Sequence, residues 1–163
     1  MASLNQKTSV LGKRLAAHLL KRTTYHITKQ RVETFAMLTP TQAIDQLFVP
    51  YTFGIDEPED YELGGPWLTN GATPILSTSK RRNIVRGWWL NEVRQDTSIV
   101  SKMQFMLHTN FVTATKGFGN DYHFFFHLAL LRFYALGNFK TLAKKIALDN
   151  LMLIYLDNRY NLK

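Results

Sequence analysis

The stretch that decides the fold is "NDYHFFFHLALLRFYAL", residues 120–136 of the 163 in the chain. At 3.6 residues per turn it is apolar nearly all round, although His127 interrupts its apolar run. A helix of this kind is stable in water only when neighbours cover it. The sequence therefore predicts a buried central helix over residues 120–136, ended by Gly137 as a C-terminal glycine.

Further segments show apolar residues at helical spacing behind polar capping residues. They are residues 11–22, 29–38, 39–48, 80–95, 99–113 and 138–148. Residues 49–78 hold four of the five prolines, which predicts a long loop rich in Pro and Gly that wraps the surface. The expected fold is all-α, a single domain over residues 1–163. It is an irregular bundle of about seven helices around the central one.

For two of these helices the sequence predicts which side chains face the core. Trp88 and Trp89 are adjacent, so they cannot share one face of their helix. Residues 99–113 leave little polar surface, because Phe105 and Met106 add to the apolar residues already on the inner side. We expect that helix to lie largely in the core.

The composition excludes several classes of site. The chain has no cysteine, so disulfides, zinc–thiolate sites, iron–sulfur ligation and cysteine nucleophiles are excluded.

No apolar run approaches the roughly 18 residues of a membrane span. No secretory signal peptide is evident near the N-terminus. Neither a phosphate-binding loop nor a serine-hydrolase motif is present.

The formal charge of +8 suggests a nucleic-acid partner as one hypothesis. Lys80, Arg81, Arg82 and Arg86 lie close to the two tryptophans, and basic and aromatic side chains together can bind nucleic acid through charge and stacking. Basic helix faces are more often simply solvated, and indoles on an apolar helix side are more often core. Nucleic acid is therefore the less favoured partner.

Polar residues in apolar surroundings are the other candidate site residues. His108 and Asn110 end a predicted core helix, where each must find a hydrogen-bond partner. His123 and His127 are four residues apart, a spacing that places two imidazoles on one helix face and can contribute to a metal site. No glutamate follows His123, so hydrogen-bonded histidines remain the plainer interpretation. Asp157 and Asn158 form a polar turn near the C-terminal end.

The order of segments resembles a known bacterial family. The quoted stretches are "LLKRTTYHITKQRVETFA", "AIDQLF", "GWWLNEVRQDTSIVSKMQFMLHTNFVT" and "LLRFYALGNFKTLAKKIALDNLMLIYLDNRYNLK". They resemble the N-terminal part of the domain-of-unknown-function 1800 family, especially its Bacteroidetes members. The resemblance implies a helical fold and no established activity, cofactor or substrate. Members are often exported, so it implies a cell-envelope or secreted protein.

The resemblance also implies that this chain is a fragment, because relatives continue into an acid-rich stretch and a long second half. The remainder of the same polypeptide would then be its partner. Where many relatives have a His-x-His pair, this chain has His108 and Asn110, which weakens a metal site of that kind.

Three functional hypotheses remain open. The first is a site centred on His108 and completed by residues outside this chain. The second is a helical scaffold or interaction module without catalysis, in which His108, Asn110, Asp157 and Asn158 satisfy helix ends. The third is a basic nucleic-acid-binding domain.

Overall fold

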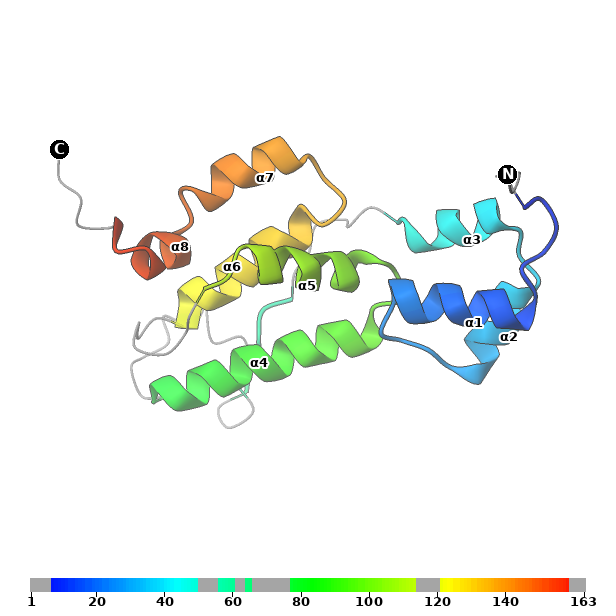
Figure 1. Cartoon of the computed structure of the whole chain (residues 1–163). Helices are drawn as coiled ribbons and strands as arrows, with labels where there is room; N and C mark the ends of the chain where they lie inside the picture. The colour runs from blue at the N-terminus through cyan, green and yellow to red at the C-terminus, as the bar shows by residue number, and fades with distance from the viewer. Residues whose placement is uncertain (1–6, 50–55, 61–63, 66–76, 114–120, 159–163) are drawn as a thin grey trace.

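A computed structural model describes residues 7–49, 56–60, 64–65, 77–113 and 121–158, and these contain eight helices and no β-sheet. Figure 1 shows α1 to α3 at one end of the molecule, α4 to α6 in the middle, and α7 and α8 toward the other end. The helices are α1 (Gly12–Thr23), α2 (Lys29–Ala36), α3 (Pro40–Leu47), α4 (Thr78–Gln95), α5 (Val100–Asn110), α6 (Asp121–Phe133), α7 (Phe139–Ile146) and α8 (Asn150–Tyr155). The predicted all-α class is confirmed.

The first three helices form a small unit with its own core. The Thr28 hydroxyl accepts from the backbone N–H of Arg31 and so caps α2. Thr39 and Gln42 form a reciprocal capping box at α3, where Pro40 takes the first helical position. The core of this unit consists of Ala16, Leu20, Phe35, Ala36, Ala43 and Leu47.

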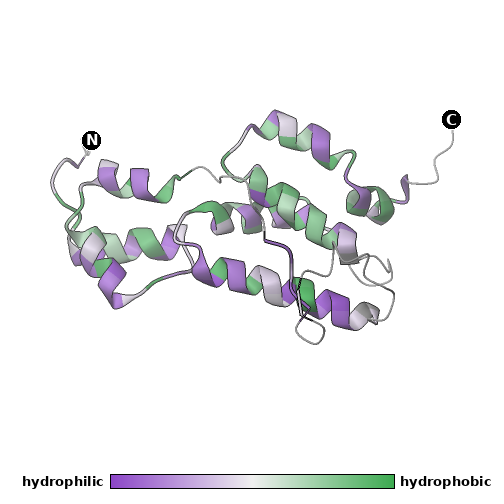
Figure 2. Ribbon diagram, turned by 180° about the vertical axis from the view of Figure 1, so that it is seen from behind, coloured by the Kyte–Doolittle hydropathy of each residue, from purple (hydrophilic) through white to green (hydrophobic). Residues whose placement is uncertain are grey.

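The central helix predicted from the sequence is α6, which packs against α4, α5 and α8. Figure 2 shows the strongly hydrophobic colouring of α6 next to the more polar α4. One cluster joins it to α4 through Val85, Trp88, Phe125 and Leu128. A second joins it to α5, α7 and α8 through Leu107, Leu131, Leu142, Ile146 and Met152.

Two helices are less buried than their composition suggests. On α6, Phe126 is 56% exposed and Phe133 is 38% exposed, because the neighbouring described helices cover only part of its circumference. On α5, Phe105 and Met106 are also exposed, so the expectation that this helix lies largely in the core is wrong for that face. An apolar side chain predicts burial only when another element reaches it.

The C-terminal helices differ from expectation in number and in boundary. Asp149 accepts from the backbone N–H of Met152 and caps a further short helix, α8, so there are eight described helices where about seven were expected. The helix α6 ends at Phe133, and Gly137 does not have the positive φ of a C-terminal glycine. A Cβ at Gly137 would lie 3.1 Å from Tyr134 Cδ1, so glycine permits this close approach.

Part of the long loop packs on α4, as a wrapping segment would. The indole Nε1 of Trp88 donates to the backbone oxygen of Asp56 at 2.7 Å, and Pro58 is fully buried. Trp89 faces another side and donates to Gln104 Oε1 at 3.3 Å, which confirms that the two indoles diverge. The expected loop aromatics Tyr51, Phe53 and Trp67 lie outside the described residues.

The turn between α4 and α5 is built around Asp96. Its Oδ1 accepts from the backbone N–H and hydroxyl of Ser98, and its Oδ2 accepts from the same two groups of Ser101. Arg132 of α6 is 6% exposed and donates to the Ser101 hydroxyl at 3.1 Å. It also lies 3.6 Å from Glu92 Oε2 and 3.9 Å from Asp96 Oδ2. This buried network fixes α6 against the ends of α4 and α5.

Polar contacts also join the first three helices to this turn. The guanidinium of Arg31 donates to the backbone oxygens of His26 and Thr97. The Nδ1 of His26 lies 3.0 Å from the backbone oxygen of Arg94. The backbone N–H of Ile99 donates to a carbonyl of α3 at 3.0 Å. The unit of α1 to α3 is therefore joined to the rest of the molecule at the α4–α5 turn.

The Asp96 network predicts a pH-dependent stability. Burial raises the pKa of Asp96, but the hydrogen bonds from Ser101 and Ser98 outweigh burial and leave the pKa below its usual value. Because the folded pKa lies below the unfolded one, the stabilisation is present above about pH 4 and is lost as the pH falls through the folded pKa. We expect Asp96→Asn to lower the free energy of unfolding by about 1–3 kcal/mol at pH 7. The difference from wild type should shrink below about pH 4.

Urea denaturation followed by circular dichroism, from pH 7 down to pH 3, measures this difference. The exposed Asp45 of α3 provides the matched control, and Asp45→Asn should leave stability nearly unchanged. A loss in Asp96→Asn that is the same at every pH would contradict the assignment.

Candidate functional site

Two imidazoles from different helices lie next to each other where α5 packs against α6. His108 lies in the last turn of α5, and His127 lies in the middle of α6. Their ring centroids are 5.7 Å apart and their planes make an angle of 64°. His127 is fully buried and His108 is partly buried. The fold thus joins two histidines that are 19 residues apart in sequence.

Asp149 fixes the orientation of His127. Its Oδ2 lies 3.1 Å from His127 Nδ1 and also accepts from the N–H of Met152 at 3.0 Å. A carboxylate is only an acceptor, so the proton of the neutral imidazole lies on Nδ1. The Nε2 of His127 therefore carries a lone pair. The capping residue of α8 is at the same time the residue that sets the histidine tautomer.

Each imidazole has one buried nitrogen that lacks a hydrogen-bond partner among the described residues. These atoms are His127 Nε2 and His108 Nδ1. A buried polar atom left in this way costs about 1–3 kcal/mol. Burial, and then the neighbouring His127, lower the pKa of His108, so its imidazole is neutral at pH 7. Two imidazoles with unused nitrogens are arranged here at an energetic cost to the fold.

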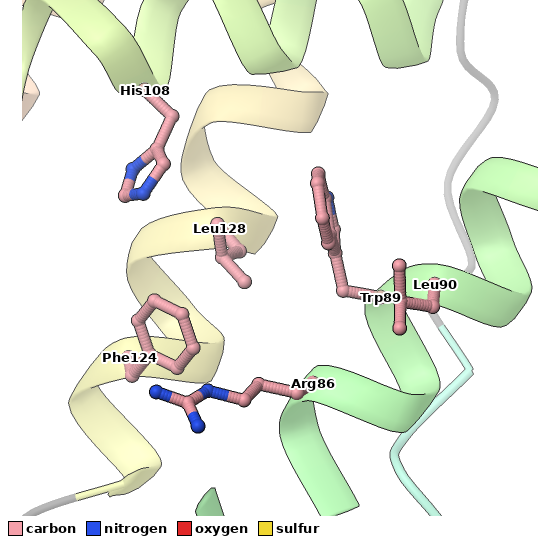
Figure 3. Close-up of a pocket in the computed structure, with 6 residues that line it drawn as sticks. All are labelled: Arg86, Trp89, Leu90, His108, Phe124 and Leu128. Carbon is pink, nitrogen blue, oxygen red and sulfur yellow. The ribbon is translucent and has the colours of Figure 1, made fainter. Parts of the chain in front are cut away.

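A cavity of about 320 Å³ lies beside His108. Figure 3 shows its walls: Trp89, Leu90 and Arg86 come from α4, His108 from α5, and Phe124 and Leu128 from α6. The described lining is mostly apolar, and the polar side chains in it are the imidazole of His108 and the guanidinium of Arg86. In Figure 3 the Arg86 side chain extends from α4 toward Phe124. This combination is typical of pockets for small organic ligands.

Gln104 links the three helices that line the cavity. It is fully buried one turn before His108. Its Oε1 accepts from the indole of Trp89, and its Nε2 donates to the backbone oxygen of Leu128 at 2.9 Å. One amide thus connects α4, α5 and α6, because a glutamine side chain both donates and accepts.

The other histidine and amide candidates are placed differently. His123 lies one turn before His127 on α6 and is half-buried, and it is not among the residues that line the cavity. Asn110 is exposed, and its Nδ2 donates to the backbone oxygen of Met106 at 2.8 Å. Asn110 therefore satisfies the end of its own helix, as the scaffold hypothesis expects of such residues.

The remaining candidates lie on the surface or on α4. Asp157 and Asn158 are exposed beyond the end of α8, and Asp157 takes a left-handed φ of 55°. Among the basic residues proposed for nucleic acid, Lys80 and Arg86 are exposed and Arg81 and Arg82 are half-buried. Of that set, Arg86 also lines the cavity.

Two features are absent from the described residues. These residues contain no group of three or more histidine, cysteine, aspartate or glutamate side chains placed to hold a metal ion. None of the helices within those residues combines the length and the apolar character needed to span a membrane.

The comparisons with known proteins give a family. The model described as "Protein of unknown function (DUF1800)" matches residues 18–163, which is most of the chain. This chain belongs to the DUF1800 family. The match confirms the family resemblance seen in the sequence, and it includes every helix from α2 to α8. Neither a curated protein nor a solved structure matches the chain.

Sequence reasoning about this DUF1800 member singled out both His108 and His127 but did not bring them together. Helical spacing related His127 to His123 on its own helix, whereas the contact with the His108 ring depends on how two helices pack. Neither Asp149 nor Gln104 was among the candidate site residues. A polar residue inside an apolar helix is the signal for such sites, but its partner depends on how the helices pack.

The unpartnered Nε2 of His127 predicts that removal of this buried side chain does not destabilise the fold. We expect His127→Leu to leave the free energy of unfolding unchanged or to raise it by up to about 1 kcal/mol. Leucine removes the buried polar atom and adds apolar contact, while Asp149 still caps α8. Urea denaturation at pH 7 tests this expectation.

Asp149→Ala is the comparison variant and should lose about 2–4 kcal/mol, because α8 loses its cap and the buried Nδ1 of His127 loses its acceptor. A loss above about 2 kcal/mol in His127→Leu would mean that the bond to Asp149 dominates and that His127 is a structural residue.

Proposed function

We propose that this chain binds a small organic anion with an apolar body in the cavity between α4, α5 and α6. The observation that carries the proposal is the composition of the cavity wall. Four apolar side chains surround the space, and the only two polar groups among its described lining residues are Arg86 and His108. A hydrophobic pocket with a few convergent polar groups is the usual form of a ligand site.

The charges favour an anion over a cation or a neutral molecule. Arg86 is always protonated and can donate to a carboxylate in bidentate fashion. His108 is neutral at pH 7 and adds a hydrogen-bonding nitrogen without a second charge. No carboxylate is among the described residues that line the cavity.

The apolar part of the ligand would lie against the rings of Trp89 and Phe124. Aromatic side chains offer large apolar surfaces that bind flat or aliphatic groups with little loss of conformational freedom. The hydrogen bonds of Gln104 keep the Trp89 wall in place, so the cavity is preformed. A preformed site binds with a smaller ordering cost.

The probe 2-naphthoate tests this proposal by isothermal titration calorimetry. We expect it to bind the wild-type chain, and we expect the neutral 2-naphthamide to bind more weakly. Arg86→Gln should weaken naphthoate binding about five- to tenfold, because a charge-assisted contact is lost. The same substitution should leave naphthamide binding unchanged.

Arg94→Gln is the matched control, because Arg94 lies two turns further along α4 and outside the cavity lining. It should bind naphthoate as the wild type does. Absence of binding at millimolar naphthoate, or equal weakening by both arginine substitutions, would overturn the proposal and leave the cavity as a packing feature of a helical scaffold.

A further inference from the structure

We propose that His108 and His127 together bind one divalent transition-metal ion, with Asp149 as the residue that orients His127. The ion would be of borderline softness, such as Zn²⁺, Co²⁺ or Cu²⁺, because imidazole nitrogen is a ligand that such ions favour. This proposal goes beyond the organic ligand site and does not depend on it.

The first argument is the state of the two rings. The Nε2 of His127 is buried and has no partner among the described residues, and it carries a lone pair when the ring is neutral with its proton on Nδ1. His108 Nδ1 is also buried without a partner among those residues, and it offers a lone pair in the tautomer with the proton on Nε2. A metal ion needs lone pairs of this kind, and imidazole binds a metal only in its neutral form.

The second argument is the distance between the rings. With metal–nitrogen bonds of about 2.0–2.1 Å, two imidazoles on one tetrahedral ion have centroids roughly 5–6 Å apart. The observed separation is 5.7 Å, and the tilted ring planes avoid a clash between the two side chains.

The third argument is Asp149. Metal-binding histidines commonly donate their second ring N–H to a carboxylate, which fixes the tautomer and makes the other nitrogen a better ligand. His127 has this arrangement, with Nδ1 at 3.1 Å from Asp149 Oδ2. The pair is almost fully withdrawn from water, since the side chain of Asp149 is 8% exposed and that of His127 is 0% exposed.

Two protein ligands leave the remaining positions of a four-coordinate ion open. This agrees with the absence of a third suitable side chain among the described residues. Open positions are typical of metal ions that act on a ligand, whereas purely structural zinc sites are closed by four protein ligands. His108 also lines the cavity, so one of the two proposed ligands borders the organic anion site.

The competing explanation is a buried water molecule that donates to both nitrogens. A water in such a place needs two to four polar partners and is common in protein interiors. Water and metal differ in two measurable respects. A chelator removes only a metal ion, and only the affinity for a metal ion depends on the Asp149 carboxylate.

The test uses the full chain without an affinity tag, stripped with a chelator and dialysed against Zn²⁺. Metal analysis should find one bound zinc per chain that chelator removes. Cu²⁺ loaded in its place should show the nitrogen hyperfine coupling of two imidazoles in electron paramagnetic resonance. His127→Leu and His108→Leu should each lower zinc affinity at least tenfold.

Asp149→Asn retains the cap of α8 but removes the carboxylate, and it should lower zinc affinity about 10- to 100-fold. His123→Gln is the matched control on the same helix and should bind zinc as the wild type does. Circular dichroism in the presence of chelator checks that each variant is folded.

Absence of stoichiometric zinc in the wild type would overturn the proposal and favour the bridging water. Unchanged affinity in both His108→Leu and His127→Leu, or an equal loss in His123→Gln, would overturn it as well. Zinc affinity is measured without naphthoate, so failure of the metal site and failure of the organic anion site are separate results.

Discussion

A buried guanidinium determines how the middle of this molecule is assembled. Arg132 lies within the apolar contact surface of α6, and a cation there is tolerated only with compensating acceptors. Glu92 and Asp96 supply the negative charge from the end of α4 and the following turn, and Ser101 supplies a hydroxyl from α5. Because all these groups must converge on one side chain, they set the axial position of α6. The same contacts hold the side of α6 that carries Arg132 against α4 and α5.

The site is a consequence of this register. Once α6 is fixed, Gln104 can join Leu128 to Trp89, and the rings of His108 and His127 come to lie side by side. The site combines two environments with different chemistry. His108 lines an apolar cavity, and it also forms with His127 a pair of imidazoles backed by the Asp149 carboxylate. Partnerless polar atoms reduce stability, so their presence in a closely packed region is better explained by binding than by folding.

The scaffold hypothesis explains some of the polar residues. Asn110 bonds to its own helix, Asn138 caps α7, and Asp157 adopts a turn conformation, so these residues serve helix ends. It does not account for His127, whose Nε2 faces no described partner. The DUF1800 family carries no assigned activity by its description, so the physical arrangement of this pair is the strongest guide to what the chain does.

The sequence by itself determined the helical class, most helix positions and several caps, such as Thr28 and Asn138, because these depend on residues within one or two turns of each other. It also identified His108 and His127 as polar residues in apolar helices. Only the tertiary structure decided that these two meet, that Asp149 orients one of them, and that Phe126 stays exposed. The physical reason is that periodicity reports which side of a helix is apolar, whereas side-chain packing and buried charge decide which helix faces that side, and at what register.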